Sequence, residues 1–486
     1  MSAYLEGEHE DGARGERHRR SPSGTAGEEH GVDAVGEALR RPAGRPILLR
    51  AGAVITLDPA FGNLVGDILI DGEKIIAVGP SLKDRAGENA IVVDAQETIA
   101  IPGLVDSHLH AWAGQLRGLS SDLDISAYMN LVHRRFAPRY RPDDIYVGNL
   151  LSSLVALDGG VTTILDNSHN ARTLEHMTAA VEGLAEAGIR AVHASGPPVD
   201  GSVSVADWSR NLERIRERYF ASEDQLLTLR VMDAAGSEDL WRHARDQDLW
   251  VSTEMGSHIT NLGDLARVGL LTEKHAFNHC ITLPDDDWRR IADAGAAVNL
   301  CARSDAHFGL GQAVPPVDQA LSMGLVPGLS TDNETVYLSD MLTEMQHLVT
   351  LHRGHAFARL AAGEKAAQLT AEQVLRFATV GGAANCGLAD RVGSLTPGKQ
   401  ADVVLLRRSD LNTALSTNAF TTLLGFSSRS NVDSVFVAGR VRKWRGRLVD
   451  HDVSRVLAAA EASRSRLMNE VGLRSDGFHD GVLPDR

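Results

Sequence analysis

The sequence has few cysteines and no long apolar run. Three cysteines occur in 486 residues, Cys280, Cys301 and Cys386, and all three lie in apolar segments. An odd, low count argues against a disulfide framework and favours a reducing cytoplasm. No run approaches the roughly 18 apolar residues of a spanning helix. Because the first thirty residues also lack an apolar segment, we expect no secretory signal.

The chain also lacks an excess of basic residues. Its formal net charge is −15 and its isoelectric point is about 5.7. Nucleic acids and anionic membranes are bound through basic surfaces, so neither is an expected partner. We expect a small-molecule substrate instead, and the charge does not indicate which one.

Length and composition fit one large α/β barrel plus a smaller module. Residues 1–46 are rich in Gly, Glu, Arg, His and Ser. Such a segment buries too little apolar area to offset its ordering entropy, so we expect a disordered tail. Short β-type runs follow at 47–98 and return at 390–450. These two segments predict a small β-sandwich domain built from both chain ends, followed by a helical extension at 451–486.

Between these segments, residues 99–389 alternate apolar runs with amphipathic helical stretches. Eight runs are strand candidates: GLVDSHLH (103–110), GVTTILDNS (160–168), IRAVHASG (189–196), LLTLRVMD (226–233), LWVSTE (249–254), HAFNHC (275–280), AAVNLC (296–301) and LVPGLSTD (325–332). Eight βα units over about 230 residues are typical of a closed (β/α)8 TIM barrel. An open doubly wound sheet is the alternative, but no G-x-G-x-x-G follows the first strand.

Unusual polar residues stand at the predicted strand ends, where barrel enzymes carry their chemistry. His108 and His110 are two apart on a strand, so both should face the barrel axis. Two unpaired imidazoles there make a poor core but good metal ligands. Asp332, at the end of the eighth run, can bind the metal and accept a proton from water. His279 ends the sixth run and should point into the same end of the barrel as His108 and His110.

With these residues in place, the chain resembles the amidohydrolase superfamily, in the group of cytosine deaminases, adenosylhomocysteine-type deaminases and triazine hydrolases. The resemblance spans about residues 47–450. It is carried by the stretches IPGLVDSHLHAWAGQLRG, GVTTILD, FNHCITLPDDDWRRIADAGAAVNLC, SDAHFGLGQAVPPVDQALSMGLVPGLSTDNE, LSDMLTEMQ and LRFATVGGAANCGLADRVGSLTPGKQADVVLL.

The resemblance implies a site with one divalent metal ion, Zn²⁺, Fe²⁺ or Mn²⁺. The first-strand H-x-H of the family matches His108 and His110 as ligands. Its eighth-strand aspartate, ligand and general base, matches Asp332, and its sixth-strand histidine, which orients or polarises the substrate, matches His279. A two-metal member would carry a lysine at the end of the fourth strand, and LLTLRVMDAAG contains none.

The fifth run departs from the family pattern. That strand usually ends in a histidine ligand, followed three residues later by a glutamate that shuttles a proton to the leaving group. Aligned by its strand end, WVSTEMGS places Glu254 at the ligand position and Ser257 at the glutamate position. The other register makes Glu254 the shuttle and puts Val251 at the ligand position. We favour the first register, because Glu254 follows four residues that are typical of a strand and a glycine comes shortly after it.

In the favoured register Glu254 is a metal ligand and joins Asp332 and His279 in the catalytic set. Two histidines and two carboxylates would neutralise a divalent ion, which would then acidify water less. Carboxylates also move the metal preference from Zn²⁺ towards Fe²⁺ or Mn²⁺. Loss of the shuttling glutamate puts nucleobase deamination in doubt. His258 is either a substitute acid or a solvated loop histidine.

Loops beyond the strand ends supply candidate substrate contacts. Two lie just past the HLH, where the family contacts its substrates, and two follow the fifth and seventh strands. The candidates are Trp112, Gln115, His258 and His307. His169 and His193, near the second and third strands, either line the mouth or are structural.

The sequence thus predicts a cytoplasmic, metal-dependent amidohydrolase. It would cleave a C–N or related bond of a small, cyclic, nitrogen-containing molecule by attack of metal-bound water. A metal-dependent lyase or decarboxylase on the same scaffold is the alternative, and a non-catalytic ligand-binding relative is a third. We also expect a homo-oligomer, a dimer or larger.

Overall fold

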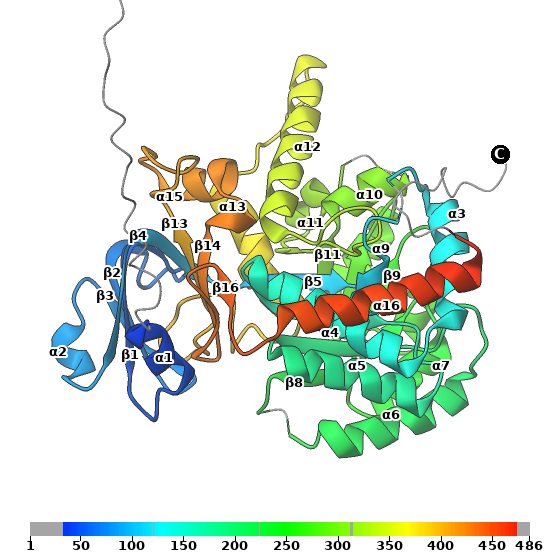
Figure 1. The fold of residues 1–486 in the computed structure, drawn as a ribbon. Helices are drawn as coiled ribbons and strands as arrows, with labels where there is room; N and C mark the ends of the chain where they lie inside the picture. The colour runs from blue at the N-terminus through cyan, green and yellow to red at the C-terminus, as the bar shows by residue number, and fades with distance from the viewer. Residues whose placement is uncertain (1–32, 120, 223, 312–313, 474–486) are drawn as a thin grey trace, which may run out of the picture.

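The computed structural model describes residues 33–119, 121–222, 224–311 and 314–473, which form a parallel barrel beside a mixed sheet (Figure 1). Each barrel strand is hydrogen-bonded to the next in chain order. The strands are β5 (Leu104–Leu109), β6 (Val161–Ser168), β7 (Arg190–Ser195), β8 (Leu227–Asp233), β9 (Trp250–Met255), β10 (His275–His279), β11 (Ala297–Leu300) and β12 (Gly328–Leu329). The predicted α/β barrel is confirmed.

The barrel closes just beyond β12, which is shorter than the predicted eighth run. The backbone N–H of Asp332 donates to the carbonyl of His108 at 2.9 Å, and the N–H of His110 donates to the carbonyl of Asp332 at 2.7 Å. A parallel bridge between Leu109 and Asp332 results. The first and eighth strands therefore meet at the residues that the sequence singles out.

Helices cover the outside of the barrel. Side-chain caps start several of them: Thr173, Ser204 and Ser237 each accept a bond from a first-turn N–H. The helices are α4 (Pro142–Asp158), α5 (Leu174–Ala187), α6 (Val205–Tyr219), α7 (Glu238–Asp246), α8 (Leu262–Arg267), α9 (Asp285–Asp293), α10 (Ala302–Phe308), α11 (Val317–Ser322), α12 (Met341–Ala361), α13 (Ala371–Arg376) and α14 (Gly382–Asn385). Among the described helices, none combines the length and apolarity needed to cross a bilayer.

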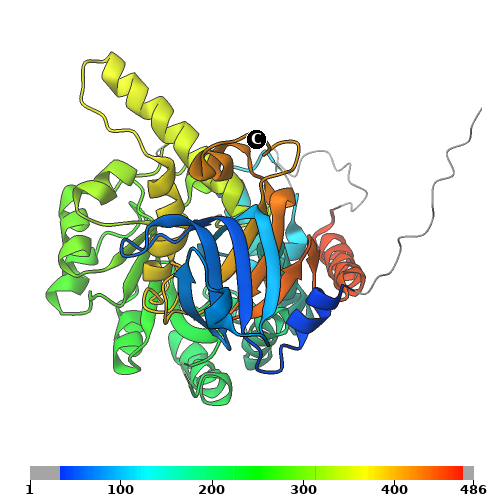
Figure 2. The same ribbon diagram turned by 90° about the vertical axis from the view of Figure 1, so that its left-hand side faces the viewer.

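The second sheet is built from both chain ends, as predicted, and its strands form one continuous mixed sheet (Figure 2). Its order is β16-β15-β14-β13-β4-β1-β2-β3. The bounds are β1 (Ile47–Ile55), β2 (Asn63–Asp71), β3 (Lys74–Gly79), β4 (Ile91–Pro102), β13 (Val403–Arg407), β14 (Val432–Val437), β15 (Arg440–Trp444) and β16 (Arg447–Leu448). Strand β4 joins the two ends, because it pairs with β1 on one side and β13 on the other.

Alternation along the strands decides which face of this sheet meets the barrel. On β13, Val404 and Leu406 join the large apolar cluster that includes barrel residues, whereas Val403 and Leu405 join the cluster on the opposite face. Successive side chains of a strand point to opposite faces of the sheet. The two units therefore share a continuous apolar contact.

The chain termini add helices to both units. Residues 1–32 of the expected disordered tail and 474–486 of the expected C-terminal extension lie outside the described residues. Within the expected tail, however, α1 (Ala34–Arg40) is a helix capped by Asp33, because Leu39 packs into the sheet cluster. Helix α16 (Val453–Val471) lies along α4, where Ser463 donates to Asp144 at 2.6 Å (Figure 1). Three short helices complete the set of α-helices: α2 (Lys83–Ala86), α3 (Ile125–Tyr128) and α15 (Ala419–Thr421).

A buried ion pair joins the barrel to the sheet. Arg190 begins β7 and donates to both carboxylate oxygens of Asp402, at 3.2 and 3.0 Å. Asp402 also accepts from the N–H of Ala438 at 2.8 Å. Arg190 is 2% exposed and Asp402 3%, so removing either partner leaves a charge buried without compensation.

We expect Asp402→Ala to lower the free energy of unfolding by about 3–5 kcal/mol, the usual cost of breaking a buried pair. Denaturant unfolding of the whole chain measures the loss. The matched control is Asp286→Ala, which removes an exposed pair with Arg289 and should change stability by less than about 1 kcal/mol. Equal effects of the two substitutions would contradict a clamping role for Asp402.

Candidate active site

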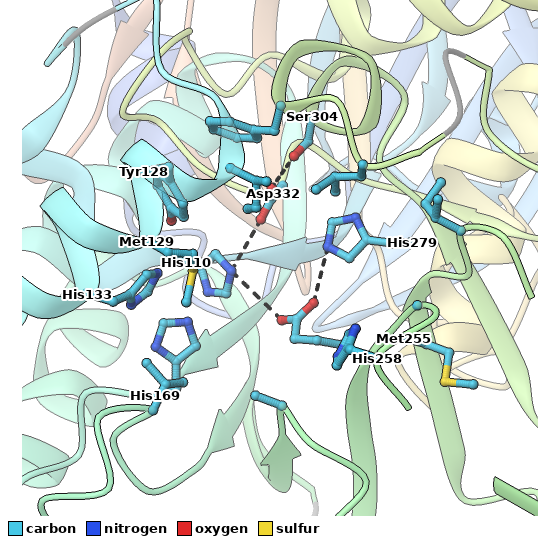
Figure 3. Close-up of a pocket in the computed structure, with 18 of the residues that line it drawn as sticks. His110, Tyr128, Met129, His133, His169, Met255, His258, His279, Ser304 and Asp332 are labelled. Carbon is cyan, nitrogen blue, oxygen red and sulfur yellow. Dashed lines mark hydrogen bonds and ion pairs between the residues drawn. The ribbon is translucent and has the colours of Figure 1, made fainter. Parts of the chain in front are cut away.

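The carboxyl ends of the barrel strands surround a cavity of about 420 Å³ (Figure 3). Four side chains at its base come from four strand ends: His110, Glu254, His279 and Asp332. His108 is fully buried beside them, on the same strand as His110. The structure therefore brings together the five residues predicted to bind metal or act in catalysis.

Histidine nitrogens and carboxylate oxygens converge closely in this cluster. Asp332 Oδ1 lies 3.0 Å from His108 Nε2 and 3.2 Å from His110 Nε2. Glu254 Oε2 lies 3.6 Å from His108 Nε2, and Glu254 Oε1 lies 3.8 Å from His110 Nε2. Two atoms bound to one zinc ion at about 2.0–2.1 Å in tetrahedral geometry are about 3.3 Å apart. The observed separations match the spacing of ligand atoms around a single ion.

Asn167, at the end of β6, supports the cluster from behind. Its carbonyl oxygen lies 2.9 Å from His110 Nδ1. A carbonyl only accepts, so Nδ1 carries the proton and, in the neutral ring, leaves the Nε2 lone pair facing the cluster. Metal-binding histidines usually show this arrangement. The Asn167 side-chain amide also contacts His108 Nδ1 at 2.6 Å and donates to Glu254 Oε1 at 2.9 Å. The donor set therefore fits a divalent metal ion.

Both carboxylates of the cluster are held ionised. Burial alone raises the pKa of Asp332, but hydrogen bonds and charges from His108 and His110 lower it well below its ordinary value. Burial opposes ionisation of Glu254 as well, and His108, His279 and His110 lower its pKa. With a metal bound, both imidazoles would be neutral, and the two carboxylates would then carry a charge of about −2, which would balance a divalent cation.

A second set of donor atoms is less suited to a metal. His108, His279 and Cys301 also lie within ligand distance of one another. Burial raises the pKa of the Cys301 thiol to about 12, so the sulfur stays protonated near neutral pH. Only the thiolate is a good ligand. The set that contains Glu254 is therefore the better candidate.

His279 and Asp332 are held by strained backbone and by polar partners. Their φ angles are 65° and 66°, in the left-handed region that side chains rarely adopt and that concentrates at functional sites. Asp305 lies 2.8 Å from His279 Nδ1. Burial lowers the pKa of His279, but Cys301, Asp305 and Glu254 together raise it well above its ordinary value. Ser304 donates to Asp332 Oδ2. Residues 304 and 305 thus position both groups.

The two registers proposed for the fifth strand place the metal-ligand position on opposite faces of β9, at residue 254 or at residue 251. Glu254 faces the cluster, and Ser252 on the same face accepts from Asn278 at 3.2 Å inside the barrel. Val251 faces the opposite way and packs between barrel and helices with residues such as Trp241. A residue at position 251 therefore has no path to the metal cluster. This geometry supports the register with Glu254 at the ligand position, and the role of Glu254 as a ligand stays a prediction.

The predicted substrate contacts divide into two groups. His258 lines the cavity rim, beside Ser257. Trp112 is fully buried behind the cavity, 5.0 Å from the Tyr140 ring. Gln115 donates to the carbonyl of Asp144 at 3.0 Å, because the 3₁₀-helix η1 (Ala111–Leu116) turns it towards α4 and α16. His307 is exposed on α10. Trp112, Gln115 and His307 do not line the cavity.

Sequence reasoning missed one whole wall of the cavity. Tyr128, Met129 and His133 line it: Tyr128 ends α3, and Met129 and His133 belong to the π-helix η2 (Met129–Phe136) that follows. His169, left open from the sequence, lines it too, whereas His193 lies under the site in a buried pair with Asp166 at 2.9 Å. A π-helix is held by hydrogen bonds between residues five apart, and its side-chain spacing differs from the α-helical period that we looked for in the sequence. The sequence pattern therefore did not indicate this wall.

Comparison with known proteins agrees with this architecture. The profile of the amidohydrolase family matches residues 99–442. The 5-methylthioadenosine/S-adenosylhomocysteine deaminase of Pelotomaculum thermopropionicum is 27% identical over 447 residues, which cover 87% of this chain and 99% of that protein. The corresponding Pyrococcus abyssi enzyme is 26% identical over 442 residues, covering 85% and 97%.

Two solved structures share the fold. One is an adenosine deaminase from Xanthomonas campestris with bound zinc, with a TM-score of 0.77 at 23% identity, covering 87% of this chain and 98% of that one. The other is atrazine chlorohydrolase from Arthrobacter aurescens complexed with zinc, with a TM-score of 0.75 at 23% identity, covering 86% and 100%. The family profile extends over well more than half of the sequence, and the chain therefore belongs to the amidohydrolase family.

Proposed function

We propose that this protein is a metal-dependent hydrolase that cleaves a C–N bond of a small, cyclic, nitrogen-containing molecule. The observation that carries the proposal is the convergence of His108, His110, Glu254 and Asp332 at ligand spacing, with His279 beside them. Family membership supports the reaction class. Relatives are named as deaminases of 5-methylthioadenosine and S-adenosylhomocysteine, which makes ammonia the first product to test.

His108, His110, Glu254 and Asp332 would hold one divalent ion. When bound, the ion supplies a Lewis acid that acidifies water and polarises the substrate. Zinc is bound in the two solved relatives, so we propose zinc as the first candidate. Carboxylate-rich donor sets also suit Fe²⁺ and Mn²⁺, so the charge that Glu254 adds keeps both as candidates.

Asp332 is the proposed general base. Its lowered pKa keeps it ionised and able to accept a proton from the attacking water. Ser304 and Asn333 hold its Oδ2 atom, the latter by a donated bond of 3.1 Å. This leaves the carboxylate fixed in orientation while the proton moves.

His279 is the proposed group that stabilises charge developing on the substrate. Asp305 engages Nδ1 at 2.8 Å, and the opposite nitrogen, Nε2, faces Glu254 at 3.2 Å. The raised pKa favours the protonated ring, which donates to a developing negative charge. In the favoured register Ser257 falls at the position of the family's proton-shuttling glutamate, and a hydroxyl cannot replace that acid. We propose His258, next to it on the rim, as the acid for the leaving group.

Zinc-loaded protein should release ammonia or an amine from at least one member of a panel of N-heterocycles and cyclic amides. Activity should disappear after chelation and return when zinc is added back, because the ion and Asp332 together activate water. Ammonia release is followed by a coupled assay at defined metal content. Carbon dioxide release without ammonia would instead indicate the decarboxylase alternative.

Replacing Glu254 tests its place in the donor set. Glu254→Gln should weaken metal affinity by at least about tenfold, because the site loses a negative charge. Glu254→His should keep about one ion per chain, since imidazole is the ligand its relatives carry there. Metal content after dialysis is measured by elemental analysis, with Ser257→Ala as the control. Full metal with lost turnover in Glu254→Gln would make Glu254 a proton-transfer residue.

Asn167 offers a second test that leaves every ligand in place. Asn167→Ala removes the contact with His108 and the bond to Glu254, and should cut metal affinity by about 10–100-fold. The control is Asn170→Ala, also buried but bonded to the carbonyl of Ala137 at 3.2 Å, away from the cluster. Competition with a fluorescent chelator gives both affinities. The same loss in both variants would point to general destabilisation.

A further inference from the structure

Three side chains form a polar wall on one side of the cavity. Tyr128, His133 and His169 line it together and are 5%, 4% and 5% exposed. The His133 ring lies 4.7 Å from that of His169 and 5.3 Å from that of Tyr128. Figure 3 shows all three beside His110 and across the cavity from His258 and Met255. These three residues are called the imidazole wall below.

The imidazole wall has hydrogen-bonding capacity that the described protein does not use. Tyr128 Oη, His133 Nδ1 and His169 Nδ1 find no partner among the described residues. Buried polar atoms are nearly always paired, and an exception next to a cavity calls for an explanation. The π-helix explains the placement: Tyr128 and His133 are five residues apart, so both reach the cavity. A bound ligand group would satisfy them.

The rest of the cavity determines the charge that such a group can carry. Among its described lining residues there is no lysine or arginine. The arginines nearby are committed elsewhere: Arg303 pairs with the buried Glu344, and Arg117 with Glu334 at 2.7 Å. At the base, Glu254 and Asp332 would balance the divalent ion, and His279 already pairs with Glu254 and Asp305. An anionic arm that projects away from this cluster would therefore meet no free guanidinium, the group that recognises carboxylates and phosphates best.

The imidazole wall does not supply a positive charge either. Burial lowers the pKa of His133 to about 3, so this ring is neutral near pH 7. A neutral imidazole has one N–H donor and one acceptor nitrogen. Together with the Tyr128 hydroxyl, the wall can both donate and accept hydrogen bonds but cannot balance a charge.

The remaining lining is apolar and adaptable. It is formed mainly by Met129, Met232, Met255, Phe308 and Leu310. Methionine side chains fill irregular gaps and adjust to different shapes. The part of a substrate that projects away from the metal cluster therefore meets an apolar surface with one polar, uncharged side.

We propose that the substrate is an uncharged or cationic ring compound whose amide-like group, able both to donate and to accept hydrogen bonds, is held by Tyr128, His133 and His169. Compounds with a carboxylate or phosphate arm are excluded. The inference rests on the proposed hydrolase function and narrows its substrate class. It separates this protein from relatives named for S-adenosylhomocysteine, a molecule that ends in an amino-acid carboxylate.

Two probes of the same shape test the proposal: an aminopyrimidine carboxamide and the corresponding aminopyrimidine carboxylate. They differ only in charge and in the amide hydrogens. Calorimetry on zinc-loaded protein measures their binding without requiring turnover. We expect the carboxamide to bind at least about tenfold more tightly. Equal or tighter binding of the carboxylate would overturn the proposal, as would no binding of either probe at millimolar concentration.

Two variants locate the effect in the wall. His133→Phe keeps a ring of similar size but removes both nitrogens, and should weaken carboxamide binding about tenfold while leaving carboxylate binding unchanged. Met129→Arg places a cation beside the wall and should tighten carboxylate binding about tenfold. The control, His347→Phe, changes an exposed histidine on α12 outside the cavity lining. Unaltered carboxamide binding in His133→Phe would rule out the wall.

Binding and turnover separate this inference from the proposed function. If the carboxamide binds as expected but the panel yields no ammonia or amine, the hydrolase proposal fails and the inference about the cavity stands. If ammonia is released faster from an anionic heterocycle than from its neutral analogue, the hydrolase proposal stands and the imidazole wall is wrongly assigned.

Discussion

The backbone bridge between Asp332 and the end of β5 is the contact on which the rest of this site depends. It closes the barrel, because β12 is only two residues long and cannot pair with β5 by itself. It also brings Asp332 Oδ1 to within 3.2 Å of both His108 Nε2 and His110 Nε2. The positive φ of Asp332 is tolerated because both of its backbone polar groups are bonded to the neighbouring strand. Barrel closure and assembly of the donor set are therefore one event, and a change that loosens one loosens the other.

Glu254 adds a negative charge to this cluster at the end of β9, where Asn167 fixes the carboxylate by a bond of 2.9 Å. The added negative charge is stable only beside positive partners, which the protonated His279 and a divalent ion would provide. Asp305 then matters for a second reason: it keeps His279 oriented towards Glu254. The unusual residue is thus embedded in a network that compensates for it.

Strand periodicity predicted the barrel, and strand-end chemistry together with the family resemblance predicted the five residues that the structure brings together at the base of the cavity. The register of the fifth strand was not decidable that way, since it depends on which face of β9 meets the barrel interior. Burial of Val251 among outer residues favours the register in which Glu254 faces the cluster. Trp112 and Gln115 follow the HLH directly, yet a 3₁₀ turn directs them into contacts with α4, α16 and Tyr140. The imidazole wall could not be predicted because a π-helix has no familiar sequence period.

The division between barrel and wall suggests how this scaffold separates chemistry from selectivity. Every residue of the metal cluster belongs to a strand or to the first residues beyond it, positions fixed by sheet hydrogen bonds. Tyr128 and His133 lie instead in the segment between β5 and α4, which can vary without disturbing strand register. Trp112 packs behind both His133 and His169, 5.9 and 5.8 Å from their rings, and so holds the wall in place without touching the cavity. Under the proposed function, the strand-end cluster would carry the reaction, and this supported wall would determine which ring compound reaches it.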